Sequence, residues 1–353
     1  METHLEDGLY FGLDDSVYHS LPYLSASKLK TILVSPFNYW ASSEMNPLRK
    51  PAPPRKRVVT NSDFMEIGRA YHKRILEGAD AFYDSYCTDF DVSAYPDALK
   101  TSTEIQEALR NRGLPVSGNK DELTRRLKMS DPTAIFFDEI YMEWQANEVD
   151  KKIIIEAEII QKIEFATAMI EKNPHLSKCF QGGYPEVTVI WTDDDGIRYK
   201  SRFDYLKPKA IIDYKGFDNS KNRKIESAIY MAMATYKYHI QAAFYMGRAA
   251  YKAVEFAKKG QVFGFATRDF LTKLAATDTH DFYFVFQQKG FAPVAEGWKF
   301  GRSSMYGCGE TAVDDAIKIY KQCLAKYGSD PWVDPKPIQE FDDANFPIFA
   351  TEL

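Results

Sequence analysis

The feature that most constrains the fold of this chain is a switch to alternating apolar and polar residues between positions 186 and 215. Three runs with this period of two, at 186–191, 197–206 and 210–215, are separated by the acidic turn sequence 193–196 and by a turn at Pro208. Such alternation puts successive side chains on opposite faces of a strand, and short turns join antiparallel neighbours. The stretch therefore predicts a three-stranded meander.

The segments on either side of the meander carry helical patterns. Residues 138–174 have a helical pattern that ends at Asn173-Pro174, residues 224–258 are expected to form one long helix, and 311–327 another. The apolar run 281–288 predicts a returning strand. Together these elements predict an α/β fold in which a mixed sheet is flanked by helices.

A further helix is predicted near the N-terminus, over residues 63–79. Its periodicity makes Met65, Ala70 and Ile75 candidates for the face that turns toward the core, and His72 lies in its middle. A histidine in such a position is ordinarily a core or surface residue rather than a ligand.

Composition excludes several classes of protein. Of the 353 residues, 45% are apolar and 27% charged, as in a soluble globular protein. No apolar run reaches the length of a membrane span, and the N-terminus METHLEDGLY lacks a basic and then apolar signal, so we expect a cytoplasmic protein. The four cysteines form no C-x-x-C pair, which argues against a disulfide framework or a closed zinc site.

Positive charge is concentrated in one loop, although the net charge of −5 argues against indiscriminate binding of polyanions. Residues 46–57 contain no acid and five basic residues, which are Arg49, Lys50, Arg55, Lys56 and Arg57. Because prolines interrupt this stretch, it cannot be a helix and is expected to be exposed. It either contacts phosphates or is simply a solvated loop.

Residues 99–128 predict a compact helical hairpin. Thr101 and Glu104 form a capping box that begins one helix, Gly113 follows its end, and a second helix begins near Asn119. Four leucines can meet between the helices, at positions 109, 114, 123 and 127. Seven basic residues against four acids give this unit a positive surplus.

The residues that suggest chemistry are Asp204, Asp213 and Lys215. Asp213 and Lys215 project from the same face of the third strand, and Asp204 on the neighbouring strand can converge on that face. Two carboxylates at this separation repel each other unless a cation lies between them, and oxygen ligands favour Mg²⁺ or Mn²⁺. Such an ion supports phosphodiester hydrolysis, and a lysine can hold the attacking water or neutralise developing charge.

The alternative is an ordinary hairpin whose acids and lysine form surface pairs, because D-x-K occurs often by chance. The context favours the site. Glu186 lies on the preceding strand, and Gln241 and Tyr245 lie four residues apart on one face of the following helix. The acidic residues 193–195 are better explained as a turn than as ligands.

In order and spacing, these residues resemble the PD-(D/E)XK nucleases of the RecE, RecB and lambda-exonuclease type. Those proteins carry G-x-x-x-H, then an acid, D…D-x-K and Q-x-x-x-Y, which match residues 68–72, 186, 204 with 213–215, and 241–245 here. RecE-type exonucleases (exodeoxyribonuclease VIII-like) are the closer resemblance. They share a Y-H…L-S-x-S-x-L-K…S-P stretch, found here within 18–36, an R-x-D strand at 202–204 and a Y-H-x-Q helix at 238–241.

The likeness covers nearly the whole chain apart from about residues 85–135, and it implies a restriction-endonuclease-like fold. It implies seven catalytic residues, which are His72, Glu186, Asp204, Asp213, Lys215, Gln241 and Tyr245. Four of these would hold Mg²⁺ or Mn²⁺, namely His72, Glu186, Asp204 and Asp213. Glu186 is either a ligand of a second metal or an anchor behind the first, Gln241 and Tyr245 either contact DNA or brace the site, and helical packing also explains Tyr245.

The inserted hairpin resembles a SAP module, a small helical DNA-binding motif; packing on the nuclease is the alternative. The implied division is a helical part at 1–85, the SAP-like insertion at 86–135 and the nuclease core at 136–353. Three groups of residues are implied to contact DNA: Arg202, Gln241 and Tyr245 near the site, Arg110, Arg112, Lys120, Arg125 and Arg126 in the hairpin, and Arg55, Lys56 and Arg57 in the basic loop.

The resemblance implies a metal-dependent exonuclease that resects double-stranded DNA ends, by analogy 5′ to 3′, in recombination and repair. The single strand would pass to an annealing protein of the RecT type. A homo-oligomer in the cytoplasm of a bacterial cell is also implied, and a phage origin fits. Two alternatives stay open, an endonuclease of the same fold and a catalytically silent DNA-binding scaffold. The scaffold is disfavoured because every catalytic position is filled.

Overall fold

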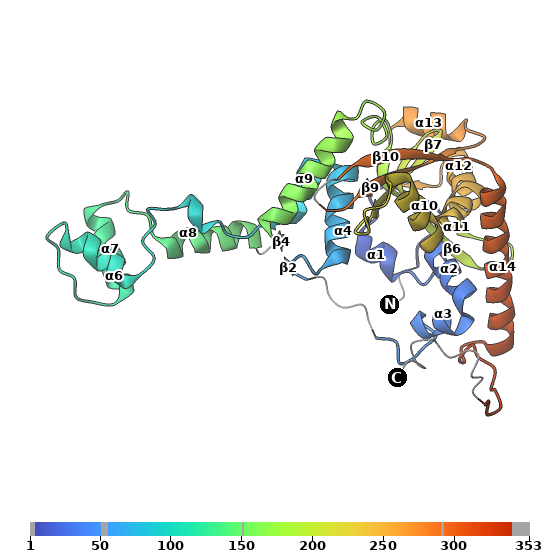
Figure 1. The fold of residues 1–353 in the computed structure, drawn as a ribbon, viewed down its shortest axis with the longest axis horizontal. Helices are drawn as coiled ribbons and strands as arrows, with labels where there is room; N and C mark the ends of the chain where they lie inside the picture. The colour runs from blue at the N-terminus through green and yellow to red at the C-terminus, as the bar shows by residue number, and fades with distance from the viewer. Residues whose placement is uncertain (1–3, 51–55, 150–151, 291–292, 341–353) are drawn as a thin grey trace.

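The computed structural model describes residues 4–50, 56–149, 152–290 and 293–340, and its centre is a mixed seven-stranded sheet (Figure 1). The strand order is β10-β9-β7-β6-β5-β1-β8. These strands are β1 (Gly8–Tyr10), β5 (Tyr184–Thr192), β6 (Arg198–Lys207), β7 (Ala210–Phe217), β8 (Val262–Phe263), β9 (Asp281–Gln288) and β10 (Ala295–Phe300). A second, parallel sheet contains β2 (Val58–Val59), β4 (Ile153–Ile155) and β3 (Tyr86–Thr88).

The predicted meander is confirmed. Strands β5, β6 and β7 are antiparallel neighbours at the centre of the sheet, and β9 returns parallel to β7. The acidic sequence between β5 and β6 is a turn, in which the Asp193 carboxylate accepts the backbone N–H groups of Asp195 and Ile197. Strand β1 and the small sheet were not predicted, because each of their strands is only two or three residues long.

Helices cover both faces of the main sheet. On one face lie α2 (Ala26–Val34), α3 (Pro36–Ser42), α10 (Ile225–Thr235), α11 (Tyr238–Phe244), α12 (Ala250–Lys259), α13 (Arg268–Ala275) and α14 (Ser304–Tyr327). On the other lie α4 (Phe64–His72), α5 (Ala79–Ser85) and α9 (Ala157–Lys172). The short α1 (Asp15–Ser20) lies near α4 in Figure 1.

Strand β9 shows why two cores form. Phe282, Phe284 and Phe286 are buried against the α10–α14 layer, whereas Val285 between them is buried against the layer of α4 and α9. A strand whose side chains alternate between two apolar layers must be buried on both faces. The sheet is therefore fixed on both sides around the strands that carry Asp204, Asp213 and Lys215.

The expectation of one long helix over 224–258 is wrong. Lys237 has a positive φ of 51°, which ends α10 and turns the chain before α11 begins. A π-helical turn at Tyr245–Ala249 then separates α11 from α12. The apolar periodicity continues through both irregularities, so the sequence pattern does not reveal them.

Two other helical predictions need correction. The segment 63–79 is α4 followed by a π-helical turn at Lys73–Glu77; Ala70 and Ile75 are buried as predicted, but Met65 is exposed. Residues 138–174 are not one helix, since α8 (Phe137–Trp144), a π-helical turn (Gln145–Val149), β4 and α9 follow each other there.

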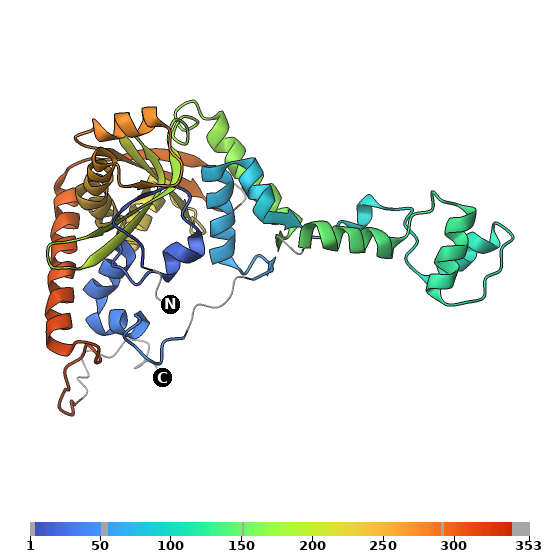
Figure 2. The ribbon, with the colours of Figure 1, turned by 180° about the vertical axis from the view of Figure 1, so that it is seen from behind.

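The predicted hairpin forms a separate unit. Helices α6 (Ser102–Arg110) and α7 (Lys120–Ser130) carry the capping boxes at Thr101 and Asn119, and they lie with α8 in an arm that extends away from the main sheet (Figures 1 and 2). Leu109, Leu123 and Leu127 are buried together in this unit, with Leu114 packed against them. A core of its own is what an insertion needs in order to fold, while the proposed division into three domains stays a prediction.

The four cysteines, all of which lie among the described residues, form no disulfide bond. Among the helices of the described segments, none combines the length and the apolar character that crossing a membrane requires.

Candidate active site

The candidate site lies where β6 and β7 separate. The two strands pair only from Tyr205 to Lys207 and from Ala210 to Ile212, so Asp204 and Asp213 follow directly on the last pair. One carboxylate oxygen of Asp204 accepts the backbone N–H of Tyr214 at 2.8 Å. The side chain thus satisfies an N–H group that the strand ladder has released, and this holds the carboxylate between the diverging strands.

Glu186 faces Asp204 from β5. On either side of Glu186, Pro185 is paired with Tyr205 of β6 and Val187 with Phe203. This register sets Glu186 opposite Asp204, but Glu186 is not itself a partner in the strand ladder. Its φ is +51°, a conformation that a residue with a side chain adopts only at a cost. Strain of this kind is typical of a functional position, and here it accompanies two acids on adjacent strands.

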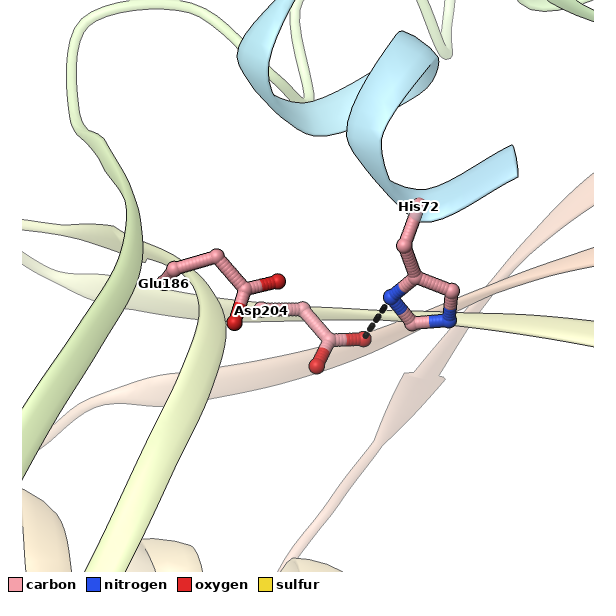
Figure 3. Close-up of side chains that lie close together, drawn as sticks. All are labelled: His72, Glu186 and Asp204. Carbon is pink, nitrogen blue, oxygen red and sulfur yellow. Dashed lines mark ion pairs between the residues drawn. The ribbon is translucent and has the colours of Figure 1, made fainter. Parts of the chain in front are cut away.

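His72 completes a three-residue cluster from the other side. It is the last residue of α4, directly before the π-helical turn, and such turns are frequent at functional sites. Its Nδ1 lies 3.8 Å from an Asp204 carboxylate oxygen, as the dashed line in Figure 3 shows. One ligand atom from each of His72, Glu186 and Asp204 lies within 4.8 Å of the other two.

Asp213 lies beside this cluster rather than within it. Its side chain is fully buried, with one oxygen 2.6 Å from Lys215 Nζ and the other accepting the Gln241 side-chain amide at 2.8 Å. Lys215 Nζ is also 4.0 Å from Asp204. Lys215 therefore bridges the two aspartates, and Gln241 on α11 fixes the orientation of Asp213.

Burial perturbs the acids and the histidine in opposite directions. Burial, together with the negative charge of Asp204, raises the pKa of Glu186 to about 8. Burial also raises the pKa of Asp213 to about 7 and the pKa of Asp204 above its usual range. Burial, followed by repulsion from Lys215, lowers the pKa of His72 to about 4. The imidazole is therefore neutral near pH 7, as a metal ligand must be.

The cluster fits a divalent cation. Without a cation, burial disfavours the ionised forms of Glu186 and Asp204, and the charge of Asp204 adds to this cost at Glu186. A cation between them would offset the cost. The positive charge of Lys215 favours the ionised forms of Asp204 and Asp213 and so offsets part of the cost of burying them. Although burial alone would lower its pKa, the charges of Asp213 and Asp204 raise it, so the ammonium stays protonated.

A cleft of about 950 Å³ opens onto the cluster. It is lined by the N-terminal segment 11–19, by Gly68 and His72 on α4, by Glu186 and Asp204, and by Phe265. Gly68 lies one helical turn before His72, and a Cβ at this position would meet no other atom within 4 Å. The space beside Gly68 is thus open toward the cleft.

Arg202 contacts protein groups rather than facing solvent. It is buried, and its guanidinium donates to Thr188 at 2.8 Å, to the Leu13 carbonyl at 2.8 Å and to Asp15 at 3.1 Å. It also stacks over the ring of Tyr18. These contacts attach the N-terminal segment to β6 along one wall of the cleft, so the geometry favours a positioning role over the phosphate contact predicted for Arg202.

Tyr245 braces the same strand. Its ring is buried and its hydroxyl donates to the Arg202 carbonyl at 2.9 Å. Of the two roles left open for Gln241 and Tyr245, bracing is therefore the one that the contacts of this structure fit.

The other basic residues predicted to contact DNA belong to the hairpin and the basic loop. In the hairpin, Arg112 pairs with Asp131, Lys120 pairs with Asp138, and Arg126 donates to the carbonyls of Pro115 and Ser117. No hydrogen bond or ion pair is found for Arg110 or Arg125 within the described segments. In the basic loop, Lys56 pairs with Asp63 and Arg57 has an interaction of its own, whereas Arg55 lies outside the described residues.

The sequence reasoning missed two contributors to the cleft. Asp15 lines it through the N-terminal segment, and Phe265 stands at its edge. Asp15 lies three residues before the Tyr18-His19 pair, with which the RecE-like N-terminal stretch begins. That position was a signal from which a place near the site could have been expected for Asp15. Nothing in the pattern around Phe265 indicates a functional position.

Comparisons with known proteins agree with this geometry at the level of the family. The family described as "PDDEXK-like domain of unknown function (DUF3799)" matches residues 25–262, about two thirds of the chain. The comparison with curated proteins gives no match. A crystal structure from Eubacterium rectale, described as a "putative exonuclease", has 11% sequence identity and a TM-score of 0.31, and the match covers 80% of this chain and 96% of that chain.

The likeness to the Eubacterium rectale structure is too low to transfer any detail to this protein. The family match covers residues 25–262, which include His72, the strands β5 to β7 and the helix of Gln241. It is long enough to establish membership. The chain therefore belongs to the family of PDDEXK-like domains of unknown function, DUF3799.

Proposed function

We propose that this protein is a metal-dependent nuclease that digests double-stranded DNA from its ends, in the 5′ to 3′ direction. The observation that carries the proposal is the cluster of His72, Glu186 and Asp204, beside the Asp213–Lys215 pair and open to the cleft. A PDDEXK-like fold with these groups supports hydrolysis of a phosphodiester. Attack from an end and polarity rest on the resemblance to RecE-type exonucleases.

His72, Glu186 and Asp204 would hold Mg²⁺ or Mn²⁺, and Asp213 would complete the set with its carboxylate. Such an ion polarises the phosphate and lowers the pKa of the attacking water. The neutral imidazole of His72 supplies a nitrogen donor, and the carboxylates supply the oxygen donors that these ions prefer.

Lys215 would act on the water and on the phosphate. Its ammonium, held by Asp213 at 2.6 Å, can donate a hydrogen bond to the attacking water and stabilise the charge that grows on the phosphate oxygens. Gln241 keeps Asp213 oriented toward Lys215, so the loss of Gln241 should misalign the pair without removing either charge.

Digestion of three forms of one plasmid tests the proposal: linear duplex, closed circle and nicked circle. With Mg²⁺ or Mn²⁺ present, we expect loss of the linear form, persistence of the closed circle, and no digestion in EDTA. Cleavage of the closed circle would indicate an endonuclease instead. Binding without cleavage in any metal would indicate a DNA-binding scaffold.

Polarity is read from linear duplex labelled at one 5′ or one 3′ end. Early release of the 5′ label as mononucleotide is expected, and early release of the 3′ label would contradict the polarity. Asp213→Asn and Lys215→Met serve as active-site variants. Asp269→Asn and Lys273→Met are a matched control, because these residues form an exposed ion pair on α13.

The assembly and the partner stay predictions. A homo-oligomer would be seen by light scattering as a multiple of the 40.5 kDa chain mass. The single strand left by 5′ to 3′ digestion is the substrate for an annealing protein of the RecT type, and co-purification of that class of protein would test the partnership.

A further inference from the structure

The search for a further feature leads to Phe265, an exposed aromatic ring at the edge of the cleft. Its side chain is 78% exposed, and Phe265 lines the same cleft as His72, Glu186 and Asp204. No ring pair or cation–π contact is found for Phe265 in the parts of the chain that the structure describes. A phenyl ring left uncovered beside a candidate phosphodiesterase centre presents a flat apolar face to whatever enters the cleft.

The backbone around Phe265 is fixed. Gly264 has φ +84°, and a Cβ there would collide with the backbone carbonyl of Phe11. The neighbouring Phe263 carbonyl accepts the N–H of Phe11 at 2.9 Å. These contacts attach the residues just before Phe265 to the N-terminal segment that forms one wall of the cleft.

The residues just after Phe265 are attached to β5. The N–H of Thr267 donates to the hydroxyl of Tyr184 at 2.8 Å, and the Thr267 side chain caps α13. Tyr184 precedes Glu186 by two residues on the same strand. The loop of Phe265 is therefore linked by one hydrogen bond to the strand that carries Glu186, and the backbone that carries the ring is held on both sides.

We propose that Phe265 stacks on a nucleobase of the DNA strand that lies in the cleft. The inference rests on the proposed function, and it adds the contact that would recognise the substrate as nucleic acid by its bases and not only by its phosphates. Nucleobases have flat faces of the size of a phenyl ring, and stacking on an aromatic side chain tolerates every base. The proposed contact is thus independent of sequence, as digestion of arbitrary DNA requires.

The chemistry of Phe265 suits a base rather than a phosphate. A phenyl ring offers a phosphate neither a charge nor a hydrogen bond, whereas an uncharged base can stack on it. Arg202, which also lines the cleft, is engaged by Leu13 and Asp15. The basic residues that line the cleft, Arg69 and Lys73, lie on the α4 side.

The test measures stacking without cleavage. Oligonucleotides with 2-aminopurine at successive positions from the 5′ end are bound in Ca²⁺ in place of Mg²⁺, and fluorescence quenching and affinity are recorded. For the wild type we expect quenching at one or two adjacent positions. Phe265→Ala should abolish it and weaken binding by about tenfold, since stacking contributes roughly 1–3 kcal/mol per base.

Matched variants separate stacking from other effects. Phe265→Trp should retain quenching and affinity, Phe265→Leu should lose both, and Phe165→Ala, which removes a 55% exposed phenyl ring on α9, should change neither. An abasic site at the quenched position should weaken wild-type binding but leave Phe265→Ala unaffected.

Quenching that persists in Phe265→Ala at the positions quenched in the wild type overturns the inference. If the wild type binds and quenches but no metal supports cleavage, the proposed nuclease function fails while the stacking contact stands. If cleavage proceeds and quenching is absent, the function stands and the stacking contact fails.

Discussion

Replacing Gly68 by alanine should stabilise the fold and impair the enzyme. Gly68 lies inside α4, and an added Cβ would meet no atom within 4 Å, so the substitution causes no clash in the free protein. Alanine is favoured over glycine in a helix by about 0.5–1 kcal/mol, because glycine loses more backbone freedom on folding. The free energy of unfolding should rise by about that amount, which corresponds to roughly 1–3 °C in melting temperature for a chain of this size.

The same methyl group projects into the cleft one turn before His72. A DNA backbone that approaches the cluster must pass close to this position, and crowding of a packed contact costs ~1–3 kcal/mol. The kcat/KM for linear duplex should therefore fall by about 5- to 150-fold. Stability and activity move in opposite directions, so lost activity could not be attributed to partial unfolding.

Gly307→Ala is the matched control. Gly307 lies in α14, far along the chain from the cleft residues, and a Cβ there would also meet nothing within 4 Å. It should gain similar stability with unchanged activity. Unchanged kcat/KM in Gly68→Ala would refute the idea that the strand approaches α4 closely, and a lower melting temperature would refute the description of open space beside Gly68.

Three further predictions concern stability, the metal cluster and the hairpin. Between about pH 6.5 and 8 the metal-free protein should lose stability as pH rises, because the pKa of Glu186 is raised to about 8 and that of Asp213 to about 7, so the folded chain keeps protons that the unfolded chain has lost. Glu186→Gln should make this slope shallower in melting curves recorded in EDTA, and an equally steep slope would contradict the account. His72→Ala should lower the cleavage rate by about 100-fold or more, whereas Asp194→Ala in the acidic turn should not. Equal losses of activity in the two variants, with normal melting temperatures, would contradict the assignment of His72 to the site. Arg110→Ala with Arg125→Ala should reduce the log–log salt dependence of DNA binding by about two, with the single-turnover rate at saturating DNA unchanged; an unaltered salt dependence would leave the hairpin without phosphate contacts.

The regular parts of the fold could be predicted from the sequence because each local pattern agrees with the tertiary structure. The strands that carry Asp204 and Asp213 are joined by the predicted turn at Pro208, and the side chains of β9 alternate between two cores. The capping box at Thr101 acts within four residues, so a short-range pattern is sufficient to locate the start of α6. The residues of the candidate site could be proposed from the order and spacing of the motifs, because such motifs are recognised along the chain without knowledge of the fold.

The contacts within the site could not be predicted, because they depend on where distant segments meet. The sequence indicates neither that Gln241 donates to Asp213 nor that Arg202 engages Leu13 and Asp15 instead of facing solvent. Both contacts join residues far apart in the chain, and either side chain would suit DNA contact equally well by type. Residue type alone therefore predicts a role for Arg202 that its burial does not favour.

The irregularities of the backbone are where the local patterns fail, and they surround the site. Glu186 has a positive φ, and β6 and β7 separate beyond the Tyr205–Ile212 pair. A π-helical turn follows His72, and Lys237 turns the chain before the Gln241 helix. A residue in a sparsely populated backbone region costs on the order of 1–3 kcal/mol, which only surrounding contacts can offset. Where β6 and β7 separate, the Asp204 carboxylate accepts the Tyr214 N–H that the strands no longer pair. The separation and the orientation of that carboxylate thus depend on each other. A chain optimised only for regular strands would keep the ladder paired and would leave no opening in which His72, Glu186 and Asp204 could meet.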